Sequence, residues 1–286
     1  MPTKTDRFAA AMKAILALEG GKVDNRADPG GRTNMGITQA VYDAWRAKSS
    51  LPERHVFDIA MSEVEDIYRF RYWDAIKGDL LPAGTDLVVF DGAVNSGPSQ
   101  SAKWLQRALA VSTVKIDGQI GAMTLEAVNA VEDQDALIAR IIDRRLGFLK
   151  ALKTWPAFGK GWMRRLDTIQ AAAQAQATGS TGPLITYIAG AETKARIDDA
   201  KQAPGKGVAD AATGGGIGAG GLSQVIQQAQ DQLTPYGAAG GWIQRLVIGL
   251  IVAGAILAAG GLAYRWYARR KAAALNDALD IDGRPA

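Results

Sequence analysis

The glycines of this 286-residue chain are unevenly distributed, and their distribution limits where a folded core can form. They crowd the part of the chain after residue 179, in runs such as GGGIGAGG at 214–221. Side chains this small bury too little apolar surface to offset the entropy lost when the backbone is ordered. A core of about 150–200 residues therefore has to form in the earlier part of the chain.

The composition disfavours several classes of function. The chain has no cysteine and a single histidine, His55, so thiolate catalysis, disulfides and multi-histidine metal sites are not expected. We expect no cofactor and no metal. The net charge of +4 suits an anionic partner such as cell wall or a membrane surface. No basic stripe with interleaved aromatic residues points to nucleic acid, which we do not expect as a partner.

The spacing of apolar residues predicts a mainly helical fold of the α+β type. Residues 5–19 form an amphipathic helix that Gly20 and Gly21 end. Thr38 is expected to cap a helix that continues through Trp45, and residues 62–65 have the form of a capping box. Further helices are expected over 86–95, 99–109, 133–152 and 161–176, with Thr124 capping another. Residues 20–37, rich in Gly, Asn, Asp and Pro, predict a loop or short hairpin.

Beyond residue 176 the pattern changes twice. Residues 177–240 are interpreted as a flexible linker rich in Ala and Gly, with short helices possible at 184–202 and 222–233. Residues 246–264 contain no charge and have nearly the length that crosses a bilayer, so they predict a transmembrane helix. Small residues spaced four apart in it favour weak helix–helix dimers in the membrane.

The membrane topology is subject to two rules that conflict. A basic cluster follows the uncharged run and favours a cytoplasmic C-terminal tail, with the N-terminal part of the chain outside (Arg265, Arg269, Arg270 and Lys271). The N-terminus, however, has no convincing signal peptide, because apolar residues 8–18 include Lys13 and no small-residue cleavage site follows. We expect a protein that crosses a membrane once.

Glu19 is the first candidate catalytic residue. It ends an apolar helical stripe, where desolvation and the negative end of the helix dipole are expected to raise its pKa. A carboxylic acid that stays protonated can donate its proton to a glycosidic oxygen. A glycine-rich turn over 28–38 (DPGGRTNMGIT) can fold back toward it and leave room for a sugar ring. Asp28 can then hold the attacking water or stabilise the anomeric carbon, or it can simply cap its own turn.

Several separate motifs resemble one known family. Residues 18–38, with Glu19-Gly20-Gly21 followed by DPGG, resemble the glycoside hydrolase family 108 lysozymes. The motifs FDGAVNSGP at 90–98, WLQRAL at 104–109 and DGQIGAMTL at 117–125 resemble the predicted peptidoglycan-binding region that follows in that family. Gly161-Trp162 and Arg164-Arg165 match its end, so the resemblance covers about residues 8–170. It implies a lysozyme-like fold and N-acetylmuramidase activity on peptidoglycan, with Glu19 as the catalytic glutamate.

Other site residues are carried over by position. The order Glu19, Asp28, Thr33 resembles the Glu-Asp-Thr triad of phage lysozymes, but Thr33 lies one residue closer than in that pattern. Asn34 can therefore take its place and is assigned to substrate binding. Asp91 and Asn95, one helical turn apart, can face the cleft and bind substrate, or form buried structural hydrogen bonds.

These features together predict a two-lobed helical domain, a linker and one transmembrane helix. The expected parts are a catalytic lobe at 1–91, a wall-binding helical lobe at 92–176, the linker at 177–240, the transmembrane helix at 241–267 and a tail at 268–286. The expected function is cleavage of the β-1,4 bond between N-acetylmuramic acid and N-acetylglucosamine by an endolysin of phage or prophage type. Because its substrate lies there, we expect a single-pass protein of the bacterial inner membrane that acts on the cell wall in the periplasm, helped by a holin or an export partner. The alternatives are a lytic transglycosylase and a non-catalytic, membrane-tethered wall-binding protein, and the intact motif around Glu19 argues against the latter.

Overall fold

The computed structural model describes residues 4–24, 31–205 and 241–280, and within these residues the chain divides into two compact units. The first unit comprises residues 1–201 with 278–286, and the second comprises residues 202–277, each as far as it is described. We treat the two units separately.

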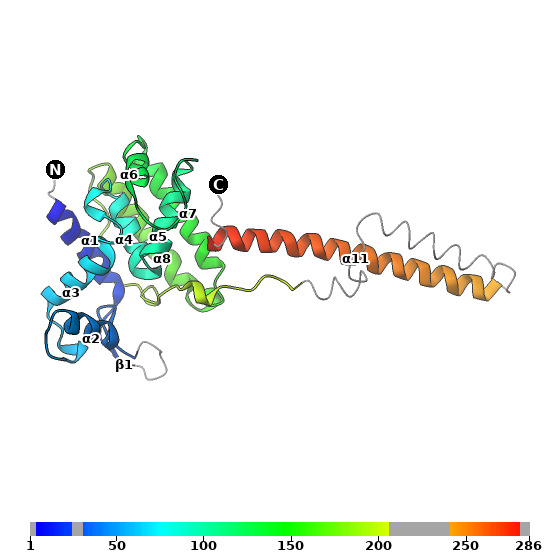
Figure 1. Ribbon diagram of the computed structural model, residues 1–286, viewed down its shortest axis with the longest axis horizontal. Coiled ribbons are helices and arrows are strands. Elements are labelled where there is room, and N and C mark those ends of the chain that lie inside the picture. The colour runs from blue at the N-terminus through cyan, green and yellow to red at the C-terminus, as the bar shows by residue number, and fades with distance from the viewer. Residues whose placement is uncertain (1–3, 25–30, 206–240, 281–286) are drawn as a thin grey trace. The chain divides into compact units, whose positions relative to one another are not determined.

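The first unit is mainly helical, as the sequence predicts (Figure 1). Its helices are α1 (Lys4–Glu19), α2 (Gln39–Lys48), α3 (Met61–Tyr68), α4 (Thr85–Ser96), α5 (Pro98–Leu109), α6 (Ala122–Asn129), α7 (Gln134–Lys150) and α8 (Trp155–Ala177). Short helical turns are η1 (Val56–Asp58), η2 (Arg69–Trp73), η3 (Gly78–Leu80) and η4 (Ile197–Asp199). The expected glycine-rich hairpin is present as a small antiparallel sheet in the order β1 (Val23–Asp24), β2 (Arg32–Asn34), β3 (Ile37–Thr38).

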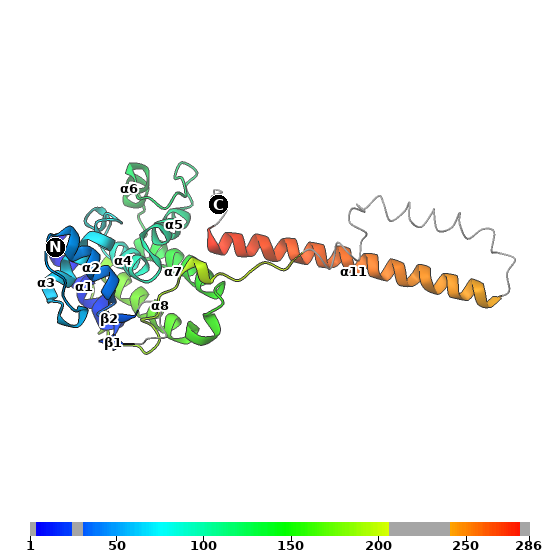
Figure 2. The same ribbon diagram turned by 60° about the horizontal axis from the view of Figure 1, so that its bottom comes forward.

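Helix α4 is the centre of the first unit. Every residue from Thr85 to Asn95 is buried, which is the pattern of a helix surrounded on all sides. It contacts α1, α5, α7 and α8, and in both views it lies between α1–α3 on one side and α5–α7 on the other (Figures 1 and 2). Phe90 of α4 packs edge-on against Trp73 of η2, with ring centroids 5.2 Å apart, and so holds α4 against η2.

Two helix starts differ from the sequence prediction, and one agrees. Thr38 caps α2 as expected, because its hydroxyl accepts a hydrogen bond from the amide of Val41. Helix α3 begins earlier than the expected capping box at 62–65, because Glu63 accepts from the amide of Ala60 at 2.9 Å and also pairs with Arg46. Thr124 does not cap α6, which already begins at Ala122.

The segment after α8 differs from the expected linker over its first part. We call residues 187–196 the strap. Ala191 and Ala195 of the strap are fully buried, and η4 behind it is fixed because Asp199 accepts from the amide of Lys153 at 2.8 Å. No longer helix forms over 184–202, since the backbone groups of the strap bind to side chains of the domain. The rest of the expected linker, 206–240 with its helix at 222–233, lies outside the described residues.

The second unit contains most of helix α11 (Gly241–Leu279). A helix over 246–264 is thereby confirmed, although it continues past the expected end at residue 267. The described part of the chain contains no helix long and apolar enough to span a bilayer, so a transmembrane segment is not supported. The expectation rested on the absence of charge, yet Gly and Ala fill about half of these positions and contribute little apolar surface. Membrane, holin and helix-dimer partners are likewise unsupported.

Candidate active site

Glu19 is the last residue of α1, and its helix is placed by the apolar stripe that the sequence shows. Phe8, Met12 and Ile15 of that stripe are buried in the core. Gly20 has a φ of +72°, a left-handed conformation that ends the helix directly after Glu19. The side chain of Glu19 is only 1% exposed. The expected burial at the helix end is therefore present.

The turn between β2 and β3 closes on the carboxylate of Glu19. Met35 and Gly36 both have positive φ, which a two-residue turn between antiparallel strands requires. The hydroxyl of Tyr68 donates to the carbonyl of Met35 at 2.9 Å and holds the turn in place. A Cβ on residue 36 would lie 2.6 Å from Oε2 of Glu19, so only glycine fits here. The glycine-rich excursion returns to the helix end, as expected.

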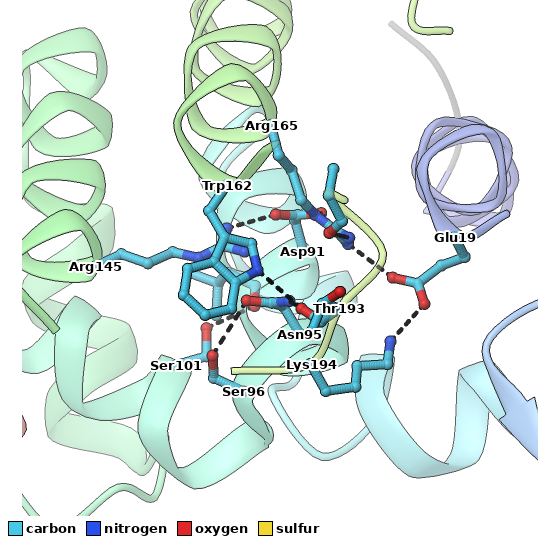
Figure 3. A network of polar contacts seen from close by, with 12 residues as sticks. Glu19, Asp91, Asn95, Ser96, Ser101, Arg145, Trp162, Arg165, Thr193 and Lys194 are labelled. Atoms are coloured by element: carbon cyan, nitrogen blue, oxygen red, sulfur yellow. Dashed lines mark hydrogen bonds and ion pairs between the residues drawn. The ribbon is translucent and has the colours of Figure 1, made fainter. Parts of the chain in front are cut away.

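Two cations bind the two oxygens of the Glu19 carboxylate (Figure 3). Nη2 of Arg165, from α8, donates to Oε1 at 2.9 Å. Nζ of Lys194, from the strap, pairs with Oε2. The sequence suggested that part of the surroundings of Glu19 is poor in water. The structure instead combines burial with two positive charges, because segments far apart in the chain meet here.

Asp91 lies deep in the same network and holds Arg165. It is fully buried on α4, and its carboxylate pairs with Arg165, at 2.9 Å from Nε, and with Arg145 of α7. Burial alone would raise the pKa of Asp91, but the two guanidinium groups outweigh it and hold that pKa below its ordinary value. Both oxygens are thus paired with buried arginines, which is the structural alternative that the sequence allowed, and the expected role in substrate binding stays a prediction.

The cations of the network are perturbed in opposite directions. Burial would lower the pKa of Arg165, but the carboxylates of Asp91 and Glu19 outweigh it and raise that pKa. For Lys194, burial outweighs the attraction of Glu19, so its pKa lies below the ordinary lysine value. Burial also lowers the pKa of Arg145. Arg165 is thus the most firmly charged cation beside Glu19.

The remaining expected site residues lie in different places. Asn95 is buried and donates from Nδ2 to the carbonyl of Thr193 at 2.9 Å, so it binds the strap.

Asn34 is buried and donates to the carbonyl of Val56 at 3.2 Å, which makes it a structural residue of the hairpin. The expected role of Asn34 and Asn95 in substrate binding stays a prediction. Thr33 lies in β2, and its hydroxyl donates to the carbonyl of Gly31 at 3.3 Å. Asp28 lies outside the described residues.

Sequence reasoning missed Arg145, Arg165, Lys194 and Tyr68 as parts of the site. Arg165 did carry a signal. It falls on the same stripe as Trp162 and Ile169, which are buried, and a charged residue on a buried stripe needs a partner. Over the part of the chain that the structure describes, no group of three or more His, Asp or Glu residues is arranged to hold a metal.

The helical domain and its buried glutamate at the end of α1 place the chain in the lysozyme-like class of glycoside hydrolases. Residues 12–97 match the family model Glycosyl hydrolase 108, and residues 100–167 match the Predicted Peptidoglycan domain. The chain is similar to the solved structure of Brucella abortus SagA, with 41% identity over 59% of this chain and 95% of that chain, and a TM-score of 0.53. The chain therefore belongs to glycosyl hydrolase family 108.

Membership of this family, with the peptidoglycan domain beside it, makes the chain a peptidoglycan hydrolase. The two matched regions meet between α4 and α5, near Gly97. Comparison with curated proteins returned no match.

Proposed function

We propose that the chain cleaves the β-1,4 bond between N-acetylmuramic acid and N-acetylglucosamine, with Glu19 as the general acid. The observation that carries this proposal is the position of the Glu19 carboxylate. It is buried at a helix end, touched by the turn at Gly36 and bound by Arg165 at 2.9 Å. The carboxylate of Glu19 is thus held in a fixed position beside a turn whose glycine contributes no side chain of its own.

The chemistry follows from the two states of this carboxylate. In its protonated form Glu19 donates a proton to the leaving glycosidic oxygen, while positive charge develops on the anomeric carbon. Once the proton has left, the guanidinium of Arg165 stabilises the carboxylate that remains. Asp91 keeps Arg165 in place without approaching the sugar, because it is fully buried.

Hydrolysis also needs a group that handles the attacking water. We propose Asp28 for that role, since it follows Glu19 by nine residues in the same motif. An Asp28→Asn variant should lose most activity with little change in melting temperature. A variant that melts earlier but keeps its activity per folded molecule would make Asp28 a turn residue only.

Product analysis decides between hydrolysis and the lytic transglycosylase alternative. Purified peptidoglycan is digested with the full chain, and the new ends of the glycan are identified. New reducing ends support the proposal. Ends in the 1,6-anhydro form would make the enzyme a transglycosylase, which needs one glutamate but no positioned water.

We further propose that the biological role is that of an endolysin of phage or prophage type, which acts on the wall. The support is the combination of a wall-cleaving region and a wall-binding region in one chain. The test is expression in a bacterial host with and without a pore-forming protein. Lysis that depends on the pore supports this role, and growth without lysis in the presence of the pore argues against it.

A further inference from the structure

The catalytic carboxylate is closed off in this structure. A general acid has to lie within about 2.6–3.2 Å of the oxygen that it protonates. The Glu19 side chain is 1% exposed, and the ammonium of Lys194 lies on its Oε2. No glycosidic oxygen can take up that position while Lys194 remains there. Access to Glu19 therefore requires the ammonium of Lys194, which the strap carries, to leave Oε2.

The strap that carries Lys194 is bound to the domain through its backbone. The carbonyl of Thr193 accepts from Nε1 of Trp162 and Nδ2 of Asn95, both at 2.9 Å, and the amide of Ala195 donates to the carbonyl of Asn95 (Figure 3). Nη1 of Arg165 donates to the carbonyl of Ala191 at 2.8 Å. The same arginine that fixes Glu19 thus also binds the strap.

The two ends of the strap differ in how firmly they are held. On its C-terminal side, Asp199 and Lys201 form backbone hydrogen bonds with Lys153 and Ala151. On the other side Leu184 is 87% exposed, and Tyr187 lies half-exposed over Gly20. The strap can therefore be released from its N-terminal end while its C-terminal end stays attached.

We propose that the strap is an intramolecular inhibitor, in which Lys194 occupies the place beside Glu19 that the glycosidic oxygen takes when the glycan binds. An ammonium only donates hydrogen bonds, so Glu19 beside it acts as an acceptor and not as the proton donor that catalysis needs. The strap lies outside both regions that match the family models, which end at residue 167. This inference rests on the proposed role of Glu19.

The test uses the full chain and three variants. Lys194→Met removes the ammonium but keeps an unbranched side chain, and Lys194→Arg keeps the charge. Lys201→Met is the matched control, since it removes an equal charge close by, where Nζ binds only the carbonyl of Lys150. The rate of wall clearing and the hydrogen exchange of residues 191–195 are measured for each.

The expected result is specific to position 194. Lys194→Met should clear wall faster by a factor on the order of ten, the effect of losing one charge-assisted hydrogen bond. In this variant the backbone amides of the strap, above all that of Ala195, should exchange their hydrogens faster than in the wild type. Lys194→Arg and Lys201→Met should behave like the wild type in both measurements.

Two results would overturn the proposal. One is a Lys194→Met variant that clears wall no faster than the wild type, which would make Lys194 neutral or helpful in catalysis. The other is unchanged exchange of the strap. If no form of the protein clears wall, the proposed function is wrong. The contact between Lys194 of the strap and Glu19 is then tested by hydrogen exchange alone. Faster exchange in Lys194→Met but not in Lys201→Met would still support it.

Discussion

The carboxylate of Glu19 and the guanidinium of Arg165 form a buried ion pair at 2.9 Å, although 146 residues separate them in the chain. Glu19 belongs to the region that matches the hydrolase family, and Arg165 to the region that matches the peptidoglycan domain. The second region therefore does more than bind wall. It supplies a cation that fixes the carboxylate of Glu19, so the two regions are joined at the candidate site.

Replacement of Glu19 by glutamine should abolish wall clearing, because an amide has no acidic proton to donate. Loss of a general acid lowers the rate by a factor on the order of 10²–10⁴. Zymography on purified wall measures the loss, and circular dichroism verifies the fold. Glu65→Gln, at an exposed position on α3, is the control and should stay active. Clearing by folded Glu19→Gln at the wild-type rate would refute the assignment.

Replacement of Asp91 by asparagine should destabilise the fold strongly. The variant leaves Arg145 and Arg165 buried without their shared carboxylate. Breaking a buried ion pair from one side costs about 3–5 kcal/mol. Urea unfolding measures the change in the free energy of unfolding, with Asp66→Asn on the surface of α3 as control. Equal midpoints for the two variants would show that Asp91 does not support the network.

The pH dependence of stability should contain a contribution from Asp86. Burial raises the pKa of Asp86 to about 6, despite its ion pair with Arg7 at 2.7 Å. The native state thus keeps this proton to higher pH than the unfolded chain, whose aspartates titrate near pH 4. The contribution of Asp86 is therefore most favourable below pH 4 and is lost as the pH rises to 6.

The measurement compares the wild type with Asp86→Asn at pH 4 and at pH 7. The free energy of unfolding of the wild type, relative to the variant, should fall by up to about 3 kcal/mol between these values. The variant cannot ionise at position 86 and provides the reference. Parallel pH profiles for the two proteins would contradict the raised pKa.

Local patterns in the sequence predicted the elements that local chemistry determines. The stripe that ends at Glu19, the hairpin that follows it and the cap at Thr38 depend on periodicity and turn residues alone. The spacing of Asp91 and Asn95 correctly placed them on one face of a helix. It could not show that this face is turned toward Arg165 and Thr193, because those partners come from distant parts of the chain.

The strap was missed for a related reason. The strap lies in a stretch of the chain rich in Ala and Gly, so composition favoured a linker. The strap is ordered because side-chain donors of Asn95, Trp162 and Arg165 bind its backbone carbonyls. These hydrogen bonds do not depend on the side chains of the strap. The sequence of the strap therefore does not indicate that this segment binds to the domain. Only Lys194 is specific to the contact with Glu19.

Because the strap binds to the helical domain, we expect the stable unit to extend beyond residue 176. A fragment of residues 1–201 should be more stable than one of residues 1–176, which the sequence suggested as the complete enzyme. The shorter fragment removes the acceptors of Asn95, Trp162 and Arg165, and each buried donor left unpaired costs about 1–3 kcal/mol. Calorimetry should show that the shorter fragment melts at a lower temperature, by about 2–4 °C for each kcal/mol of stability that it loses. Both fragments lack residues 278–286, so the difference is due to residues 177–201, and equal melting temperatures would contradict it.

Gly36 should be indispensable, whereas Gly21 should tolerate a methyl group. A Cβ at residue 36 would lie 2.6 Å from Oε2 of Glu19 and 2.5 Å from the hydroxyl of Tyr68, and the φ of +73° disfavours any side chain. Gly36→Ala should therefore push the turn away from Glu19 and lower both activity and stability, the latter by about 1–3 kcal/mol. Gly21→Ala is the matched control, because a Cβ there meets nothing within 4 Å. Wall clearing and urea unfolding are measured on both variants. Similar activity in the two would show that the turn at Gly36 does not shape the site.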